Sequence, residues 1–330
     1  MKMSTYIIQR SKIEQVFNMN DYLTTVERAF ILYGEGKMQM PPKEYLYFDK
    51  GDMRCMPVHI PSMKIAGVKN VTVHPNNKDM PVVMATITLI DPDTGYPLAI
   101  MDGTHITKMR TGAAGGIAAK YLSREDSEIA TFIGTGDQAR TQLKALLIAR
   151  PRISKIIAYD VSKDSMKDFA QMVNNEYGLD AEYTLSVDEA AGKADIITTT
   201  TPVRTPIVKA EHIRKGVHIN AIGADARGKQ ELDFEVLTQS RIIIDNWEQS
   251  SHSGEINVAV SKEVITQKDI YGDIGEIVTG QKPGRESSDQ KTIFDSTGLA
   301  IQDITAAFEI YRRIIIDKRD LSKLVKIDLI

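Results

Sequence analysis

The sequence predicts an α/β protein that combines a doubly wound parallel sheet with a second, smaller α+β domain. Three observations carry this prediction: a glycine-rich turn between a buried strand and a helix, an alternation of strands and helices from residue 128 to residue 245, and a strand-rich first hundred residues. Alternating strands and helices are typical of parallel sheets, whereas successive strands joined by short turns are typical of antiparallel ones.

The first element that we expect is a helix over residues 11–36. Its apolar residues recur at helical spacing, Asp21 is a candidate N-cap, and Gly34 with Gly36 would end it. Residues 40–101 then favour strands separated by Pro, Asn, Asp and Gly. The expected strands are Glu44–Phe48, Met53–Ile60, Ile65–Val73, Val82–Ile90 and Leu98–Met101, with a hairpin turn at 91–95. This pattern predicts a largely antiparallel sheet with a helix.

Residues 110–122 are rich in glycine and alanine, and such small side chains let a helix approach another backbone or a ligand closely. We place the domain boundary here. A helix expected over Leu299–Ile315 should return to the first domain. Residues 1–115 and 300–330 are therefore predicted to form one domain, and residues 116–299 the other.

The second domain is expected to begin with a buried strand over 128–133 that leads into a G-x-G-x-x-A turn. Gly134 permits the tight turn, and Gly136 removes a Cβ that would block a pyrophosphate. Ala139 keeps the following helix close to the sheet, and the N–H groups at the start of that helix can bind phosphate. The alternative is a loop that merely needs glycine.

The next strand, Lys155–Tyr159, is followed by Asp160, about 20 residues beyond the turn, where an acid typically binds a ribose 2′-hydroxyl. A carboxylate there repels a 2′-phosphate, so NAD is preferred to NADP. Helices at 162–177 and 187–193 and strands at 181–185, 195–201, 218–222 and 241–245 follow. Six strands between 128 and 245 match a complete Rossmann domain that binds a dinucleotide.

Composition limits the class of protein. The chain has 330 residues, a net charge of −3 and a single cysteine, Cys55. These values disfavour nucleic acid as a partner and exclude an intrachain disulfide. The sequence has no C-x-x-C or H-E-x-x-H pattern and no run of 18 apolar residues, so we expect no metal site, no membrane span and a cytoplasmic location.

Candidate chemistry lies at strand ends and on strands. Thr198–Pro202 and the loop containing Asp225 follow two predicted parallel strands, and ligands of such sheets bind beyond the carboxyl ends of the strands. Asp225 is placed to orient or deprotonate a water, or it simply forms a turn. Lys69 interrupts an apolar strand. It either faces solvent, which alternation alone favours, or lies buried with a lowered pKa.

Several segments together resemble the ornithine cyclodeaminase/μ-crystallin family over nearly the whole chain, and within it the archaeal-type alanine dehydrogenases. They are Met40–Lys43, Met56–Pro57, Gly67–Lys69, His74–Pro75, Met101–Asp102, Arg110–Gly116, the glycine-rich turn, Asn220–Asp225, Gly228–Leu232, Gly254–Asn257, Gly284–Ser287 and Phe294–Ala300. The resemblance implies a Rossmann domain, a substrate-binding and dimerisation domain, and a homodimer formed through the N-terminal sheet.

The resemblance also implies roles for single residues. Lys69 would be the catalytic lysine, and Asp225 the acid that handles water or the substrate amine. Lys43, Arg54 and Arg110 would bind the substrate. The expected cofactor-binding residues are Thr111, Gly134, Gly136, Asp137, Gln138, Ala139, Asp160, Thr200, Ala221, Gly223, Gly298 and Leu299. Members often have threonine where Val82 stands, which would remove one cofactor hydrogen bond here.

Substrate choice depends on Arg54. In ornithine cyclodeaminases this position looks like a glutamate that receives the distal amine, and arginine would repel that amine. The expected reaction is NAD-dependent deamination of a small L-amino acid, L-alanine to pyruvate and ammonia, and its reverse. The alternatives are reduction of a cyclic imine such as pyrroline-2-carboxylate, then ornithine cyclodeamination, and last a non-enzymatic crystallin-like binding protein.

Overall fold

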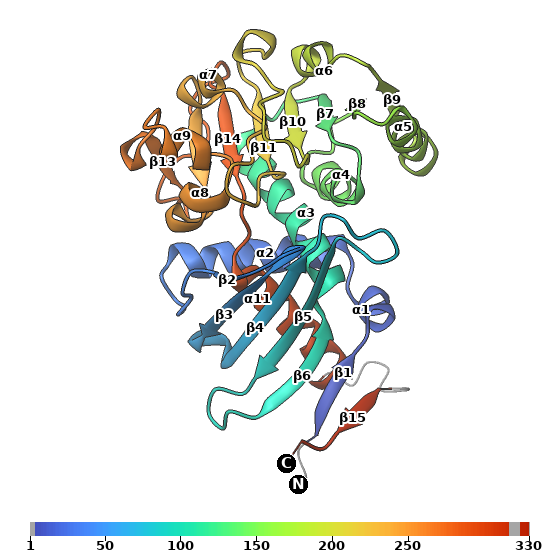
Figure 1. The fold of residues 1–330 in the computed structure, drawn as a ribbon, viewed down its shortest axis with the longest axis vertical. Coiled ribbons are helices and arrows are strands. Elements are labelled where there is room, and N and C mark those ends of the chain that lie inside the picture. The colour runs from blue at the N-terminus through green and yellow to red at the C-terminus, as the bar shows by residue number, and fades with distance from the viewer. Residues whose placement is uncertain (1–3, 317–323, 330) are drawn as a thin grey trace. The chain divides into compact units, whose positions relative to one another are not determined.

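The computed structural model describes residues 4–316 and 324–329. The chain divides into two compact units: Met1–Arg110 with Leu299–Ile330 forms the first unit, and Thr111–Gly298 the second. Figure 1 shows a sheet with helices in each unit. The predicted α/β class with a parallel sheet is confirmed.

The first unit contains a seven-stranded sheet in the order β15-β1-β6-β5-β4-β3-β2. Its strands are β1 (Thr5–Ile8), β2 (Glu44–Phe48), β3 (Gly51–Ile60), β4 (Ile65–Val73), β5 (Val83–Ile90), β6 (Pro97–Asp102) and β15 (Val325–Ile327). All neighbouring pairs are antiparallel except β1 with β6. The largely antiparallel sheet is therefore confirmed, although β1 and β15 were not expected from the sequence.

The helices of the first unit are α1 (Arg10–Val16), α2 (Met19–Gly34) and α11 (Ala300–Tyr311), which continues as a π-helical segment over Arg312–Ile316. The single helix expected over 11–36 is wrong, because the chain breaks between α1 and α2. Asn18, not Asp21, caps α2: its side chain accepts hydrogen bonds from the backbone N–H groups of Asn20 and Asp21. Asp21 completes the capping box from its third position.

One face of this sheet is covered by helix. α11 packs against β3, β4 and β5 and crosses behind them in Figure 1, and α2 packs against α11. Burial along β3 and β4 alternates residue by residue, as expected for strands with one covered face. Gly67, Lys69 and Val71 lie on the covered face. An added Cβ at Gly67 would clash with Ile304 of α11, so glycine permits this close approach.

The second unit contains an eight-stranded sheet in the order β13-β12-β14-β11-β10-β7-β8-β9, in which every neighbouring pair is parallel. The strands are β7 (Ile129–Ile133), β8 (Lys155–Tyr159), β9 (Asp180–Tyr183), β10 (Ile196–Thr199), β11 (His218–Ala221), β12 (Arg241–Ile244), β13 (Ile270–Asp273) and β14 (Thr292–Asp295). The expectation that six strands complete this sheet is wrong, because β13 extends one edge and β14 lies between β11 and β12.

The remaining helices are α3 (Gly103–Leu122), α4 (Asp137–Ala149), α5 (Lys163–Tyr177), α6 (Val187–Lys193), α7 (Phe234–Thr238), α8 (Trp247–Ser253), α9 (Asn257–Ser261) and α10 (Ile274–Val278). Short 3₁₀ turns lie at Pro61–Met63, Ala210–His212 and Gln267–Asp269. The boundary between the two units falls within the α3 segment, between residues 110 and 111. Within residues 4–316 and 324–329, no helix is both long and apolar enough to cross a membrane.

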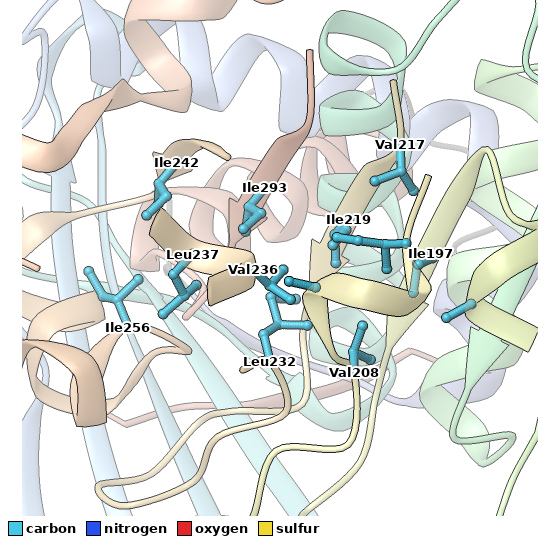
Figure 2. Packing of buried hydrophobic residues seen from close by; sticks show 14 of the residues in the cluster. Ile197, Val208, Val217, Ile219, Leu232, Val236, Leu237, Ile242, Ile256 and Ile293 are labelled. Atoms are coloured by element: carbon cyan, nitrogen blue, oxygen red, sulfur yellow. The ribbon is translucent and has the colours of Figure 1, made fainter. Parts of the chain in front are cut away.

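The core on one face of the second sheet is built from branched aliphatic side chains. Ile197, Ile219 and Ile293 come from the neighbouring strands β10, β11 and β14, and Val236 and Leu237 of α7 pack with them (Figure 2). The chain runs from β7 outward to β8 and β9 and then returns to β10 on the other side of β7. The order of strands thus reverses at β7 and β10, and open α/β sheets bind ligands at such a switch point.

Candidate functional site

The glycine-rich turn follows β7 at this switch point. Gly134 has φ +91°, and an added Cβ would lie 2.9 Å from Thr200 Oγ1, so the protein itself requires glycine there. At Gly136 an added Cβ would meet no protein atom within 4 Å. Gly136 is the N-cap of α4, and no side chain from the described residues caps that helix. Open space beside uncapped N–H groups fits a bound pyrophosphate.

Asp160 follows β8 and faces the turn. One carboxylate oxygen accepts hydrogen bonds from Thr135 N at 2.8 Å and Thr135 Oγ1 at 3.0 Å. The other accepts one from Ser162 N at 3.0 Å. A carboxylate offers about four acceptor positions, so capacity is left for a ribose hydroxyl. The same side chain therefore orders the turn and can select the nucleotide.

Replacing Asp160 with asparagine is expected to weaken NADH binding about tenfold and to narrow the preference for NADH over NADPH, because the charge that repels a 2′-phosphate is lost. Fluorescence titration with each nucleotide measures both effects. Thr135→Val is the control, since it removes a hydroxyl bond to Asp160 without changing the charge. Equal loss of selectivity in both variants would mean that Asp160 acts only by ordering the turn.

Lys69 is the centre of a buried ionic cluster in the first unit. Its side chain is 1% exposed, and its amine donates a 2.7 Å hydrogen bond to Asp303 Oδ2. The other oxygen of Asp303 accepts a 2.9 Å hydrogen bond from Arg110 Nε. The alternation-based expectation that Lys69 faces solvent is wrong, because its side of β4 is the side that α11 covers.

Burial and, to a lesser extent, the nearby charge of Arg110 together lower the pKa of Lys69 to about 7, although Asp303 opposes both effects by stabilising the ammonium. Lys43 adds a smaller lowering effect. An amine with a pKa near neutrality can both donate and accept a proton at the pH of the cell.

Arg54 shares the covered face of the sheet with Lys69. Its Nε donates to Asp52 Oδ1 at 2.8 Å and its Nη2 to Asp52 Oδ2 at 3.3 Å, and its guanidinium lies 5.5 Å from the ring centre of Tyr45. Arg54 is buried, whereas Lys43 is half-exposed. Arg54, Arg110 and Lys43 are positively charged, and Lys69 is so below its pKa of about 7, so this part of the first unit can attract an anionic ligand.

The loops after β10 and β11 are tied together by Glu231. Each of its carboxylate oxygens accepts two hydrogen bonds of 2.6–2.9 Å. The donors to Oε1 are the backbone N–H and the hydroxyl of Thr201. The donors to Oε2 are the hydroxyl of Thr199 and the backbone N–H of Gly223. Of the predicted cofactor residues, Thr200 and Gly223 lie on these loops, and Ala221 is the last residue of β11. Asp225 follows them, one-third exposed, and accepts a 2.5 Å hydrogen bond from Lys229.

Glu231 belongs to a chain of buried carboxylates. The backbone N–H groups of Glu231 and Leu232 donate to Glu255, and those of Glu255 and Ile256 donate to Asp295. Burial raises the pKa of both glutamates, and the charge of Glu231 raises that of Glu255 further. Four donors stabilise an ionised Glu231, so the proton of this pair resides on Glu255.

The other predicted cofactor residues lie in three places: at the start of α4, in α3, and in the segment that leads into α11. Gly298 has φ +80°, and its N–H donates to the buried Asp245, as does that of Thr297. Asp137 and Gln138 form the first turn of α4, with Gln138 Nε2 donating to Thr141 Oγ1. Thr111 accepts a hydrogen bond from Gln142 at its carbonyl, Leu299 is the N-cap of α11, and Ala139 is buried against the sheet.

Three residues of these clusters were missed from the sequence: Asp303, Gln302 and Glu231. Two polar residues within the apolar start of α11 were a usable signal, because charged groups are rarely buried without a partner. The sequence offers no such signal for Glu231, because nothing in the residues around it reveals the two loops that it joins. In the parts of the chain that the structure describes, no group of three or more His, Cys, Asp or Glu side chains could hold a metal ion.

A parallel sheet with a glycine-rich turn at its switch point and an acid after the next strand defines a Rossmann-type nucleotide-binding fold. A model of the ornithine cyclodeaminase/mu-crystallin family matches residues 3–318. The chain belongs to this family.

Several relatives are similar over nearly their whole length. The chain is 50% identical to an alanine dehydrogenase of Archaeoglobus fulgidus over 311 residues, 94% of this chain and 95% of that protein. It is 32% identical to a Delta(1)-pyrroline-2-carboxylate reductase of Bacillus cereus over 313 residues, 93% of this chain and 96% of that protein.

Solved structures of the same two kinds of enzyme are also similar to the chain. An archaeal alanine dehydrogenase dimer with bound NAD superposes with a TM-score of 0.94 at 48% identity, covering 99% of this chain and 100% of that one. The Delta(1)-pyrroline-2-carboxylate reductase of Thermococcus litoralis, in complex with NADH and L-proline, has a TM-score of 0.92 at 38% identity, covering 95% and 98% of the two chains.

Proposed function

We propose that this protein is an NAD-dependent amino-acid dehydrogenase that converts L-alanine, NAD⁺ and water to pyruvate, ammonium and NADH, and catalyses the reverse reaction. The observation that carries the proposal is the buried Lys69 amine, which donates to Asp303 beside Arg110. The 50% identical alanine dehydrogenase and the structure of an alanine dehydrogenase with NAD support the choice of substrate and cofactor.

The residues of the chain would divide the work. Lys43, Arg54 and Arg110 bind the substrate carboxylate by charge and hydrogen bonds. Lys69 polarises the carbonyl or imine and moves a proton to or from it, and its pKa of about 7 suits both directions. Asp225 orients and deprotonates the water that hydrolyses the imine. NAD, when bound at the turn of Gly134 and Gly136 with Asp160 on its ribose, supplies the hydride chemistry.

Reduction of a cyclic imine such as pyrroline-2-carboxylate is the second candidate. The same lysine could protonate a ring imine, and relatives at 32% and 38% identity are pyrroline-2-carboxylate reductases. The two functions differ in one requirement: a ring imine already contains its nitrogen, whereas pyruvate must first acquire one from ammonia.

Absorbance of the reduced nicotinamide separates the candidates. Purified protein is mixed with NADH and pyruvate, with and without ammonium, and separately with NADH and pyrroline-2-carboxylate. Oxidation that needs pyruvate and ammonium together supports the dehydrogenase. Oxidation by the cyclic imine alone overturns it in favour of the reductase. If neither occurs, proline formation from ornithine tests the cyclodeaminase, and failure there despite NADH binding would leave a binding protein.

We also propose that the protein acts as a cytoplasmic homodimer formed through the outer face of the first sheet, opposite α11. This outer face comprises half-exposed or exposed apolar side chains on neighbouring strands: Leu46, Met53, Pro57, Val68, Met84 and Ile100. Leu46 and Phe48 of the edge strand are 53% and 49% exposed. Apolar side chains gathered on an accessible sheet face, here with Thr72 and Thr88 among them, are typical of protein interfaces, and a solved relative is a dimer.

Replacing Ile100 with glutamate is expected to convert the dimer to a monomer, because burying an unpaired carboxylate in an apolar interface costs several kcal/mol. Analytical ultracentrifugation should show twice the 36.7 kDa chain mass for the wild type and the single mass for the variant. Leu185→Glu is the control, since Leu185 is 72% exposed in the second unit. A folded Ile100→Glu protein with the dimer mass would refute this interface.

A further inference from the structure

Asp303 connects the two cations that the proposed reaction uses. It lies in the first turn of α11 and is 0% exposed. Oδ2 accepts a hydrogen bond from Lys69 Nζ at 2.7 Å, and Oδ1 accepts one from Arg110 Nε at 2.9 Å. A single carboxylate thus binds a side chain from β4 and one from α3, and charge-assisted bonds of this length are the stronger kind.

Gln302, the residue before Asp303, fixes Arg110 a second time. Its Oε1 accepts hydrogen bonds from Arg110 Nη1 at 3.1 Å and from Leu299 N at 2.9 Å. Both partners are donors, so the amide cannot be turned around without placing its NH₂ group against them. Arg110 therefore contacts two consecutive residues of α11 through two different nitrogens, and its direction is set by the start of that helix.

We propose that Asp303 is the positioning residue of this site: one oxygen aims the Lys69 amine, the other fixes Arg110, and neither touches the substrate or the cofactor. This inference rests on the function proposed above. It adds that a residue outside the predicted site sets the direction and the charge state of the Lys69 amine. Both oxygens bind cations and the side chain is 0% exposed, so we assign the carboxylate a role that acts through Lys69 and Arg110.

The charges around Lys69 make this role measurable. Arg110 on α3 and Lys43 before β2 disfavour the ammonium, as does burial, and Asp303 on α11 is the group that favours it. Arg54 on β3 shares the covered face but is paired with Asp52. Tyr22 on α2 lies within the field of Asp303, and burial raises the pKa of its phenol well above the usual range, so it stays neutral. Removing the Asp303 charge should therefore lower the pKa of Lys69.

The test is the titration midpoint of Lys69 in the full-length protein labelled with ¹³C-lysine, with no substrate present. The Lys69 resonance is identified by its loss in Lys69→Met. Asp303→Asn is expected to move the midpoint down by about 1 to 3 pH units, the usual effect of a neighbouring opposite charge. Asp303→Glu keeps the charge and should leave the midpoint near that of the wild type. Asp52→Asn is the control: it removes one negative charge from the carboxylate that pairs with Arg54, and it should leave the Lys69 midpoint unchanged.

Activity provides the second measurement. In the direction of amination, kcat/KM at pH 7 should fall tenfold or more in Asp303→Asn, because each unit of lowered pKa reduces the ammonium population up to tenfold. In Asp303→Glu, kcat should fall with an unshifted pH profile, because the longer side chain misdirects the amine. If Asp303→Asn does not fold, Asp303→Glu alone decides, and wild-type kcat in that variant overturns the proposal.

The proposal would also be overturned if folded wild type and Asp303→Asn had equal Lys69 midpoints. Asp303 would then only stabilise the fold. The titration needs no turnover. A wild-type protein that oxidises NADH with none of the substrates would therefore refute the proposed function, while the titration would still decide whether Asp303 controls the lysine.

Discussion

Replacing Lys69 with methionine is expected to lower kcat/KM for the amination of pyruvate by about two to four orders of magnitude, the usual contribution of a positioned acid or base. Methionine has a similar length and no charge, so it suits the buried position. Asp303 keeps its hydrogen bond to Arg110 and is not left unpaired. Binding of NADH, measured by fluorescence, should therefore remain close to that of the wild type.

The pH profile adds a second expectation. In the direction of amination Lys69 must carry a proton, so the wild-type rate should fall as the pH rises through about 7. In the direction of alanine oxidation the amine must be neutral, so the rate should rise across the same range. Lys69→Arg keeps the charge at every accessible pH and should show no rise in the oxidative direction.

Lys50→Met is the matched control, because Lys50 is an exposed lysine in the turn between β2 and β3 of the same unit. It should keep wild-type activity and the wild-type pH profile. Substantial activity in Lys69→Met, or an unchanged oxidative limb in Lys69→Arg, would show that another group transfers the proton. The proposed mechanism would then be wrong at its central residue.

The burial of Lys69 illustrates the limit of sequence periodicity. Alternation assigns residues to two faces of a strand, but it does not tell which face a distant helix covers. The side chain at position 69 lies on the face that α11 covers, and α11 begins at residue 300. Its partner Asp303 is equally remote in sequence. The family resemblance identified the lysine, but the pairing depends on a long-range contact that no local pattern contains.

The second unit was easier to predict, because its signals are local. The strand, turn and helix around Gly134 and Gly136 follow one another directly, and each element has its own pattern of residues. The strand β14 was missed for the opposite reason. Its residues, Thr292–Asp295, lie beyond the alternating stretch of residues 128–245, and the chain inserts them between β11 and β12. Non-local strand order is set by packing in three dimensions.

Replacing Glu231 with glutamine is expected to destabilise the protein by about 3 kcal/mol or more, because a buried donor loses its acceptor. Each oxygen of Glu231 accepts one backbone N–H, that of Thr201 or that of Gly223. Threonine hydroxyls can rotate away from an NH₂ group, but backbone N–H groups cannot. Either orientation of a glutamine amide therefore places its NH₂ group against one backbone N–H that has no other acceptor within reach of this side chain. Calorimetry should show a Tm lower by roughly 5 to 10 °C, since 1 kcal/mol shifts a domain of this size by a few degrees.

Replacing Glu255 with glutamine is expected to raise the stability of the folded protein, whereas Glu231→Gln lowers it. The two variants are therefore a matched pair. Burial and the charge of Glu231 raise the pKa of Glu255 well above its ordinary value of about 4.5. Between a pH of about 4.5 and the folded pKa, such a carboxyl group is protonated in the folded protein and ionised in the unfolded chain. The wild type therefore loses stability as the pH rises from about 4.5 to the folded pKa. Glu255→Gln carries no such proton, so its stability relative to wild type should grow over this window.

The pair also separates stability from cofactor binding. Glu231 fixes the loops that carry Thr200 and Gly223, so Glu231→Gln should weaken NADH binding at temperatures where the variant is still folded. Glu255 accepts hydrogen bonds from the backbone of Glu231 and Leu232, farther along the loop than Gly223, and a glutamine amide oxygen can still accept them, so Glu255→Gln should leave that affinity close to the wild-type value. If Glu255→Gln proved as unstable as Glu231→Gln at neutral pH, the proton would not reside on Glu255. The buried carboxylates would then carry two charges, and another cation or water would have to stabilise them.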